Sequence, residues 1–220
     1  MPRTIILVRH GESEHHVRRL TGGWTDTPLT PRGHQQARLC AARLRHELGG
    51  TPVRVISSDL KRASQTAQAI AEALDAPLEL DVRLREHNNG EAANLSLEEA
   101  QARWPGSFSG GLPLDAPPWP GAESGRAFFE RCAAFLNEAF DERPAVAVTH
   151  GGSLTRLVGC WLNLPAEQLA EVGFEAHPTG ITVLRDTHYM GRTIERLNDV
   201  AHLTGEHGRV MLGAIVSGHW

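Results

Sequence analysis

The stretch TIILVRHG (residues 4–11) begins with a short apolar run rich in β-branched residues and ends in arginine, histidine and glycine. Such a run is typical of a strand buried on both faces of a parallel sheet. Two further runs share this character and helical patterns lie between them: strands Val53–Ile56 and Ala145–Val148, helices Pro31–Leu48, Leu60–Leu74 and roughly Ser124–Asp141. Strands that alternate with helices predict an α/β fold, with a largely parallel central sheet and helices on both faces.

Two of the expected helices carry recognisable end signals. Thr30 is the expected N-cap of the first, Pro31 takes its first helical position, and Gly49-Gly50 follows its last residue. The tetrapeptide Ser96-Leu97-Glu98-Glu99 has the form of a capping box. It predicts the start of a shorter helix.

The segment Trp104–Gly121 differs from its surroundings in amino-acid composition, because it holds five prolines, four glycines and two tryptophans. It is expected to form an ordered loop or lid, and its tryptophans either line a pocket or pack the loop onto the body. Later strands are expected at Gly180–Arg185 and Arg192–Leu197, whereas Arg209–Trp220 has no assignable pattern. The length predicts one domain, 1–220, with an inserted lid or helical segment at about 87–123.

Composition narrows the classes of protein. The net charge of -4 argues against a broad nucleic-acid or anionic-membrane surface, although it allows a small cationic pocket. The three cysteines are widely spaced and form no CxxC pair, so neither a disulfide framework nor a zinc knuckle is indicated. No stretch is long and apolar enough for a membrane span or a signal peptide. We expect a soluble cytoplasmic protein, and the sequence leaves a homodimer open.

Two of the expected strands end in the same way. TIILVRHG ends in His10 and Gly11, and VAVTHGG (residues 146–152) ends in His150 and two glycines. In open α/β sheets ligands bind beyond the carboxyl ends of the strands, and glycine lets the backbone approach a ligand closely. Both imidazoles are therefore expected at one site.

Other strand ends supply charge for that site. Arg62 is expected in the first turn of a helix, where backbone N–H groups and the helix dipole already favour an anion, and Arg9 adds a second guanidinium beside His10. Forked guanidinium donors match the oxygens of a phosphate group. Glu86, after another apolar-rich segment, is the best-placed carboxyl group to donate a proton to a leaving oxygen.

Taken in order along the chain, these motifs resemble the histidine phosphatase superfamily, also called the phosphoglycerate mutase-like family. The resemblance spans Arg3 to about Leu203. It rests on the motifs Arg9–Ser13, Thr21-Gly22 with Trp24, Pro28–Thr30 with Gly33, Ser57–Ala63 with Gln65–Ala67, Leu84–Glu86, Thr149–Gly152, Leu197–Asp199 and His202-Leu203.

The resemblance implies a phosphohistidine at His10, a phosphate pocket formed by Arg9, Arg62 and His150, and Glu86 as proton donor and then base. It also implies contacts from Thr21, Gly22 and Gly151 to the phosphate or substrate. No metal or cofactor is implied.

Two departures from the family pattern bear on the pocket. His16 stands where much of the family has a phosphate-binding asparagine, and His15 stands at a position that is often aromatic. We hypothesise that the His16 ring donates to phosphate, so that affinity falls as the ring loses its proton near neutral pH. The second departure is Gly90–Asn94, where many phosphatases carry Gly-Glu-Trp-Glu-Gly. A differently shaped pocket wall is therefore expected.

Three activities remain open, with hydrolysis of a small phosphomonoester favoured. A phosphoglycerate mutase would carry a longer, basic insertion between Glu86 and His150, but residues 87–149 contain only four basic residues: Arg103, Arg126, Arg131 and Arg143. A binding module that only recognises a phosphorylated partner would need neither a nucleophile nor an acid. A metallohydrolase is disfavoured, because the 12 histidines form no HExxH pattern or similarly tight ligand spacing.

Overall fold

A mixed six-stranded sheet forms the centre of the computed structural model, which describes residues 3–105, 111–139 and 143–203. The strand order is β3-β2-β4-β1-β5-β6, with four parallel strands from β3 to β1 followed by the antiparallel hairpin β5–β6. The strands are β1 (Thr4–Arg9), β2 (Arg54–Ser57), β3 (Leu78–Leu80), β4 (Ala145–Thr149), β5 (Ile181–Thr187) and β6 (Gly191–Asp199). The predicted largely parallel α/β fold is confirmed.

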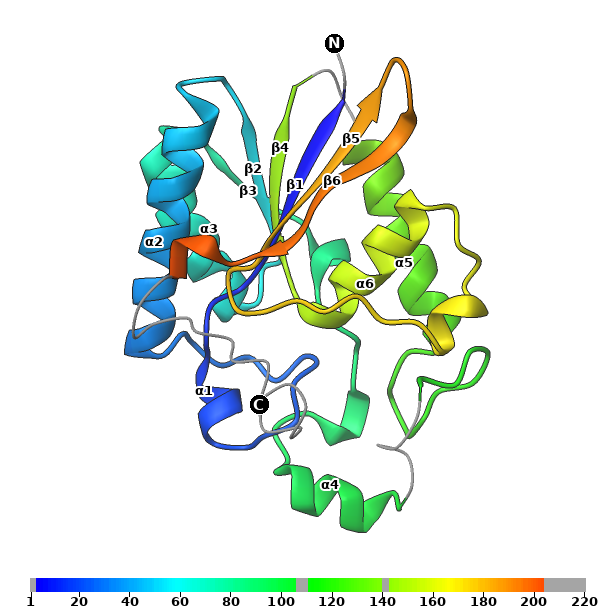
Figure 1. The fold of residues 1–220 in the computed structure, drawn as a ribbon. Coiled ribbons are helices and arrows are strands. Elements are labelled where there is room, and N and C mark those ends of the chain that lie inside the picture. Colours follow the sequence, from blue (N-terminus) through cyan, green and yellow to red (C-terminus); the bar gives the residue numbers. More distant parts are fainter. Residues whose placement is uncertain (1–2, 106–110, 140–142, 204–220) are drawn as a thin grey trace.

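Helices cover both faces of the sheet, and shorter helices lie beyond its carboxyl end. Figure 1 shows α2 and α3 on one face, α5 and α6 on the other, and α1 and α4 below the strand ends. The α-helices are α1 (Glu14–Val17), α2 (Pro31–Leu48), α3 (Lys61–Leu74), α4 (Leu97–Arg103), α5 (Gly125–Ala139) and α6 (Gly151–Trp161). Short 3₁₀ turns occur at Val82–Leu84, Gly90–Ala92, Gln168–Ala170 and Ala201–Leu203.

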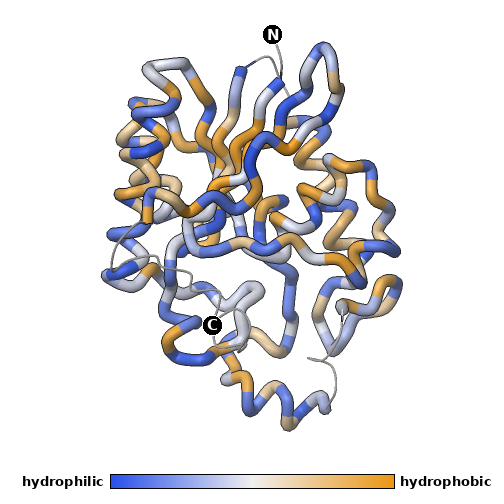
Figure 2. The backbone as a smooth tube through the Cα atoms, in the orientation of Figure 1, coloured by the Kyte–Doolittle hydropathy of each residue, from blue (hydrophilic) through white to orange (hydrophobic). Residues whose placement is uncertain are grey.

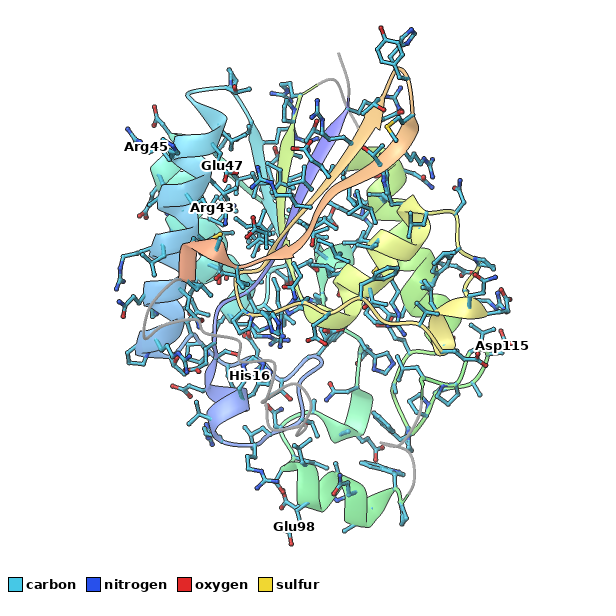
Figure 3. All side chains as sticks on the ribbon, in the orientation of Figure 1. His16, Arg43, Arg45, Glu47, Glu98 and Asp115 are labelled. Atoms are coloured by element: carbon cyan, nitrogen blue, oxygen red, sulfur yellow. The ribbon has the colours of Figure 1, made fainter. Side chains whose placement is uncertain are left out.

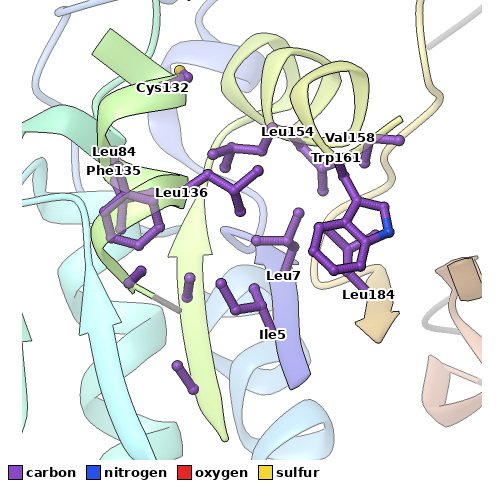
Figure 4. Packing of buried hydrophobic residues seen from close by; sticks show 14 of the residues in the cluster. Ile5, Leu7, Leu84, Cys132, Phe135, Leu136, Leu154, Val158, Trp161 and Leu184 are labelled. Atoms are coloured by element: carbon purple, nitrogen blue, oxygen red, sulfur yellow. The ribbon is translucent and has the colours of Figure 1, made fainter. Parts of the chain in front are cut away.

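The alternation of side chains along β1 divides the core between the two faces. Ile5 and Leu7 pack toward α5 and α6, whereas Ile6 and Val8 pack toward α2 and α3. Figure 4 shows Leu7 among Leu154, Trp161 and Leu184 on the first face. In Figure 2 the hydrophobic segments accordingly concentrate along the central strands. Burial on both faces fixes the register that places His10 beyond the sheet edge.

The loop after β1 is held against the first turn of α2. Thr30 caps this helix as predicted, because its Oγ1 accepts from Gly33 N at 3.0 Å. The same hydroxyl donates to Glu12 Oε1 at 2.7 Å. A Cβ on Gly33 would lie 1.9 Å from the carbonyl oxygen of Glu12, so no larger residue fits this approach. The packing anchors the chain two residues after His10.

The segment predicted as an insertion packs on the loop that follows α1. Its capping box is confirmed, since Ser96 Oγ accepts from Glu99 N and the Glu99 carboxylate accepts from Ser96 N. Thr21 N donates to the carbonyl oxygen of Leu95, and Trp119 is buried with its Nε1 donating to the carbonyl oxygen of Asn89. Neither Trp104 nor Trp119 lines the pocket described below.

Some elements differ from the sequence expectations. The strand β3, the single turn α1 and the helix α6 were not assigned, and Leu60 precedes α3 as its N-cap rather than belonging to it. Arg209–Trp220 and the end of the predicted helix at Asp141 lie outside the described residues. Within the described residues, no helix has the length and apolar character needed to cross a membrane.

Candidate active site

The carboxyl ends of β1, β2 and β4 border a pocket of about 630 Å³. Arg9, His10, Arg62 and Glu86 all line it. His150 belongs to the same group, since its ring centroid lies 5.1 Å from that of His10. The structure thus brings together the five residues singled out from the sequence.

His10 is buried in a defined tautomeric state. Its Nδ1 lies 2.7 Å from the carbonyl oxygen of Gly11, a group that can only accept, so Nδ1 carries the proton. Arg62 Nε donates to His10 Nε2 at 3.2 Å, which places the lone pair on Nε2. Burial, then the neighbouring Arg62 charge, lowers the pKa of His10 well below its ordinary value. The ring is therefore neutral at pH 7, with a nucleophilic nitrogen at Nε2.

Arg62, in the first turn of α3 as predicted, is 1% exposed. Its Nη1 donates to the carbonyl oxygen of Thr25 and its Nη2 to that of Gly23, both at 2.7 Å. Two backbone anchors thus fix the guanidinium plane and leave Nε directed at His10. Burial lowers the pKa of Arg62 to about 10, so it stays cationic at neutral pH.

Arg9 is held between the segment before β5 and α1. Its Nη1 donates to the carbonyl oxygen of Ala176, and its Nη2 donates to His16 Nε2 at 3.1 Å. Its Nε is buried and has no hydrogen-bond partner. A charged group with an unpaired donor in this position favours an anion.

His150 caps the start of α6. Its Nε2 lies 2.9 Å from Ser58 Oγ, while its Nδ1 is buried without a hydrogen-bond partner. In the part of the chain that the structure describes, only three buried side-chain nitrogen or oxygen atoms lack a partner: Arg9 Nε, His150 Nδ1 and His202 Nδ1. Two of the three belong to this site. Because buried polar groups are almost always paired in native proteins, these two nitrogens favour the binding of a further polar group.

Glu86 is positioned by backbone groups. Its Oε1 accepts from His87 N and its Oε2 from Gly152 N, both at 2.8 Å. Its carbonyl oxygen accepts from Trp24 Nε1 at 2.8 Å and from Arg131 Nη2 at 3.2 Å. The carboxylate thus points at the N-terminal turn of α6, beside His150.

Of the other residues expected to contact the phosphate or substrate, two line the pocket and one does not. Gly22 and Gly151 line the pocket, and so does His15, whereas Thr21 does not. The Thr21 hydroxyl donates instead to the carbonyl oxygen of Ala92 and is buried among backbone groups. Its side chain is therefore not available to a phosphate in this structure.

His16 lies beyond the carboxyl ends of the strands (Figure 3). Because a guanidinium can only donate, His16 Nε2 accepts from Arg9 Nη2. Burial, then the charges of Arg9 and Arg62, lowers the pKa of His16 to about 4. Loss of its proton is therefore expected near pH 4 rather than near neutral pH, and the ring is neutral at pH 7. Donation from this ring to a phosphate stays a prediction.

Two features of the site were not identified from the sequence. A Cβ at Gly152 would lie 2.3 Å from Glu86 Oε1, so the second glycine of VAVTHGG is what admits the carboxylate. The doubled glycine was a visible signal for this contact. The wall formed by residues 173–176 carries no motif, and only the fold brings it beside Arg9. Among the described residues, no group of three or more His, Cys, Asp or Glu side chains is arranged to hold a metal ion.

Known proteins resemble this chain in sequence and in fold. The model of the histidine phosphatase superfamily (branch 1) matches residues 5–200. Probable phosphoglycerate mutase GpmB of Escherichia fergusonii is 35% identical over 208 residues, which cover 90% of this chain and 94% of that protein. Its counterpart from Escherichia coli O1:K1 is 40% identical over 169 residues, or 74% of this chain and 76% of that one.

Solved structures of phosphatases share the fold. A mycobacterial glucosyl-3-phosphoglycerate phosphatase is 26% identical with a TM-score of 0.77, over 90% of this chain and 99% of that one. A phosphoserine phosphatase from Entamoeba histolytica, solved with 3-phosphoglyceric acid, is 25% identical with a TM-score of 0.71, over 91% of this chain and 98% of that one.

Proposed function

The chain belongs to the histidine phosphatase superfamily, and we propose that it hydrolyses small phosphomonoesters through a phosphohistidine at His10. One observation carries this proposal: two unpaired buried nitrogens, Arg9 Nε and His150 Nδ1, accompany the neutral ring of His10. A phosphoryl group beside His10 would supply the acceptors that these nitrogens lack.

In the first step, His10 Nε2 attacks phosphorus as the ester P–O bond breaks. The Gly11 carbonyl oxygen holds the proton on Nδ1 and stabilises the positive charge that develops on the ring. Arg62 Nε, which donates to Nε2 before substrate binds, turns to a phosphoryl oxygen once Nε2 bonds phosphorus. The nucleophile thus needs no base to activate it, because it is already neutral.

Charge on the transferring phosphoryl group is stabilised by donors that are fixed in advance. Arg62 is anchored through its Nη atoms by two carbonyl oxygens and Arg9 by one, so both guanidinium groups stay beside His10 while Arg62 Nε exchanges its acceptor. His150 donates from Nδ1 when Ser58 Oγ donates to its Nε2. Preorganised donors of this kind commonly supply the largest share of catalysis.

Glu86 transfers protons in both steps. Its protonated form gives a proton to the departing alkoxide, and the resulting carboxylate then accepts one from a water molecule. That water attacks phosphorus, the P–N bond breaks, and phosphate leaves with His10 neutral again. The hydrogen bonds from His87 N and Gly152 N keep the carboxyl group in one orientation throughout.

Access of water favours a phosphatase over a mutase. Among the described residues, the rim of the pocket includes the exposed Gly173 and Glu175, so water can reach a phosphohistidine. The names of the Escherichia relatives favour the second candidate, a phosphoglycerate mutase, which would return the phosphoryl group to its substrate.

We place either reaction in the cytoplasm, because Cys40, Cys132 and Cys160 are all unpaired.

Turnover of a panel of phosphomonoesters in EDTA tests the proposal. We expect release of inorganic phosphate with the chelator present, and none from the His10→Ala protein. Transfer between substrate hydroxyls without net phosphate release would identify the mutase. Binding without any turnover would identify a module that only recognises phosphate, and activity abolished by EDTA would identify a metallohydrolase.

A further inference from the structure

A second hollow of about 480 Å³ adjoins the phosphate pocket on the side of Glu86. The two spaces share Glu86, Gly152, Thr155 and Gly173 in their linings. If Glu86 protonates the leaving oxygen, as proposed above, the alcohol portion of the substrate must lie beside its carboxyl group. The adjoining hollow is therefore the space into which the leaving alcohol extends.

Arg156 lines this hollow from α6. It stands four residues after Gly152, which places the two residues on one face of the helix, about one turn apart. Gly152 N holds Glu86 Oε2. Arg156 is thus about one helical turn beyond the residue whose N–H holds Glu86.

Within the described residues, no hydrogen bond or ion pair is made by the guanidinium of Arg156, although the charges of Glu86 and Glu123 act on it at longer range. It lies over the Phe128 ring at 4.9 Å and is only partly exposed. Arg131 stacks at 4.9 Å on the same ring, but it is bound to Glu123 and to the carbonyl oxygens of Arg83, Arg85 and Glu86. Of the two arginines that contact the Phe128 ring, Arg131 therefore has its hydrogen-bond partners in the protein, whereas Arg156 can donate to a ligand.

We propose that Arg156 binds a carboxylate on the alcohol portion of the substrate, so that the enzyme prefers phosphorylated carboxylic acids. This inference rests on the proposed function. A carboxylate matches the guanidinium fork with two parallel hydrogen bonds. A second phosphate fits less well than a carboxylate, because it carries more negative charge and the hollow is also lined by Glu86 and the exposed Glu171.

A matched pair of substrates isolates the contact. In 3-phosphoglycerate a carboxylate stands where glycerol 3-phosphate has a hydroxymethyl group. We expect the kcat/KM of the wild-type enzyme to favour 3-phosphoglycerate by roughly 10- to 100-fold, as for a charge-assisted hydrogen bond. Arg156→Gln should bring this ratio close to one, and Arg156→Lys, which keeps the charge but loses the fork, should give an intermediate ratio.

Arg126→Gln is the matched control, because Arg126 is an arginine on α5 that pairs with Asp115 and Glu167 away from the hollow. It should keep the wild-type ratio. A ratio that is the same in the wild type and in both Arg156 variants overturns the inference, since a merely structural role would change both substrates alike.

The inference and the proposed function fail in different ways. Absence of turnover even with p-nitrophenyl phosphate would refute the hydrolase and leave Arg156 to be tested by calorimetry on the His10→Ala protein. Tighter binding of 3-phosphoglycerate than of glycerol 3-phosphate, lost in the double variant His10→Ala, Arg156→Gln, would then support the carboxylate contact. Equal binding of the two compounds would overturn it.

Discussion

The role of His10 as a nucleophile depends on which of its two ring nitrogens carries the proton. The Gly11 carbonyl oxygen fixes it on Nδ1, and Arg62 faces the lone pair on Nε2. Residue types and their spacing predicted that His10, His150, Arg9 and Arg62 would meet. They could not predict the tautomer, which depends on a carbonyl group oriented by the folded loop. Nor could they show that Thr21 would turn its hydroxyl to the carbonyl oxygen of Ala92.

Replacing Gly152 tests how Glu86 is positioned. An alanine Cβ there would lie 2.3 Å from Glu86 Oε1, so Gly152→Ala must displace the carboxyl group. We expect kcat to fall about 100-fold or more, the scale of a lost general acid, while circular dichroism shows a folded protein. Glu86→Gln, which leaves Gly152 unchanged, should lower kcat by a similar factor, and the double variant should lose little more, because both changes remove the same group. Losses that simply multiply in the double variant would contradict the assignment of Glu86.

His16 makes the stability of the fold depend on pH. Its pKa in the folded protein, about 4, lies below the ordinary 6.5, so between these values the unfolded chain binds a proton that the folded chain does not. Stability therefore falls as the pH drops from 6.5 toward 4. His16→Asn should reduce this dependence by about 1 kcal/mol per pH unit, measured by urea denaturation from pH 4.5 to 6. Identical slopes for the two proteins would show that His16 does not remain neutral in the fold.

Among the elements, those with strong local signals were predicted well. The helix α2 carries a threonine cap, a proline at its first position and a glycine after its end, and its bounds match the prediction. The strand β3 has only three residues with an exposed centre, so it shows no alternation. The helix α6 is buried almost all round, which removes the polar face that reveals a helical period. The strand β3 was missed because it is short, and the helix α6 was missed because it is buried on nearly every side.

The cap of α2 links an element to the site. Thr30→Ala removes the acceptor of Gly33 N and the donor to Glu12, and it should destabilise the fold by about 1 kcal/mol in urea denaturation. Thr30→Ser keeps the hydroxyl and should retain most of the stability. If serine and alanine destabilise the protein equally, the loss arises from packing of the threonine methyl group and not from the cap.

The site is formed by residues that follow the ends of four different strands. Arg9 and His10 follow β1, Arg62 follows β2, Glu86 follows β3 through a 3₁₀ turn, and His150 follows β4. Parallel strands bring their carboxyl ends to one edge, which is why residues 140 positions apart in sequence can meet there. The largely parallel α/β class was predictable from strand and helix patterns, whereas the strand order, the wall at residues 173–176 and the adjoining hollow are seen only in the folded chain.

Trapping the phosphoenzyme tests the central claim most directly. The enzyme is mixed with excess phosphomonoester, quenched in alkali within milliseconds to preserve phosphohistidine, and digested for mass spectrometry. We predict one phosphoryl group on the peptide that contains His10, absent from the His10→Gln protein and formed as fast as the first turnover. Steady phosphate release with no label on His10, or with the label on another residue, would contradict covalent catalysis by this histidine.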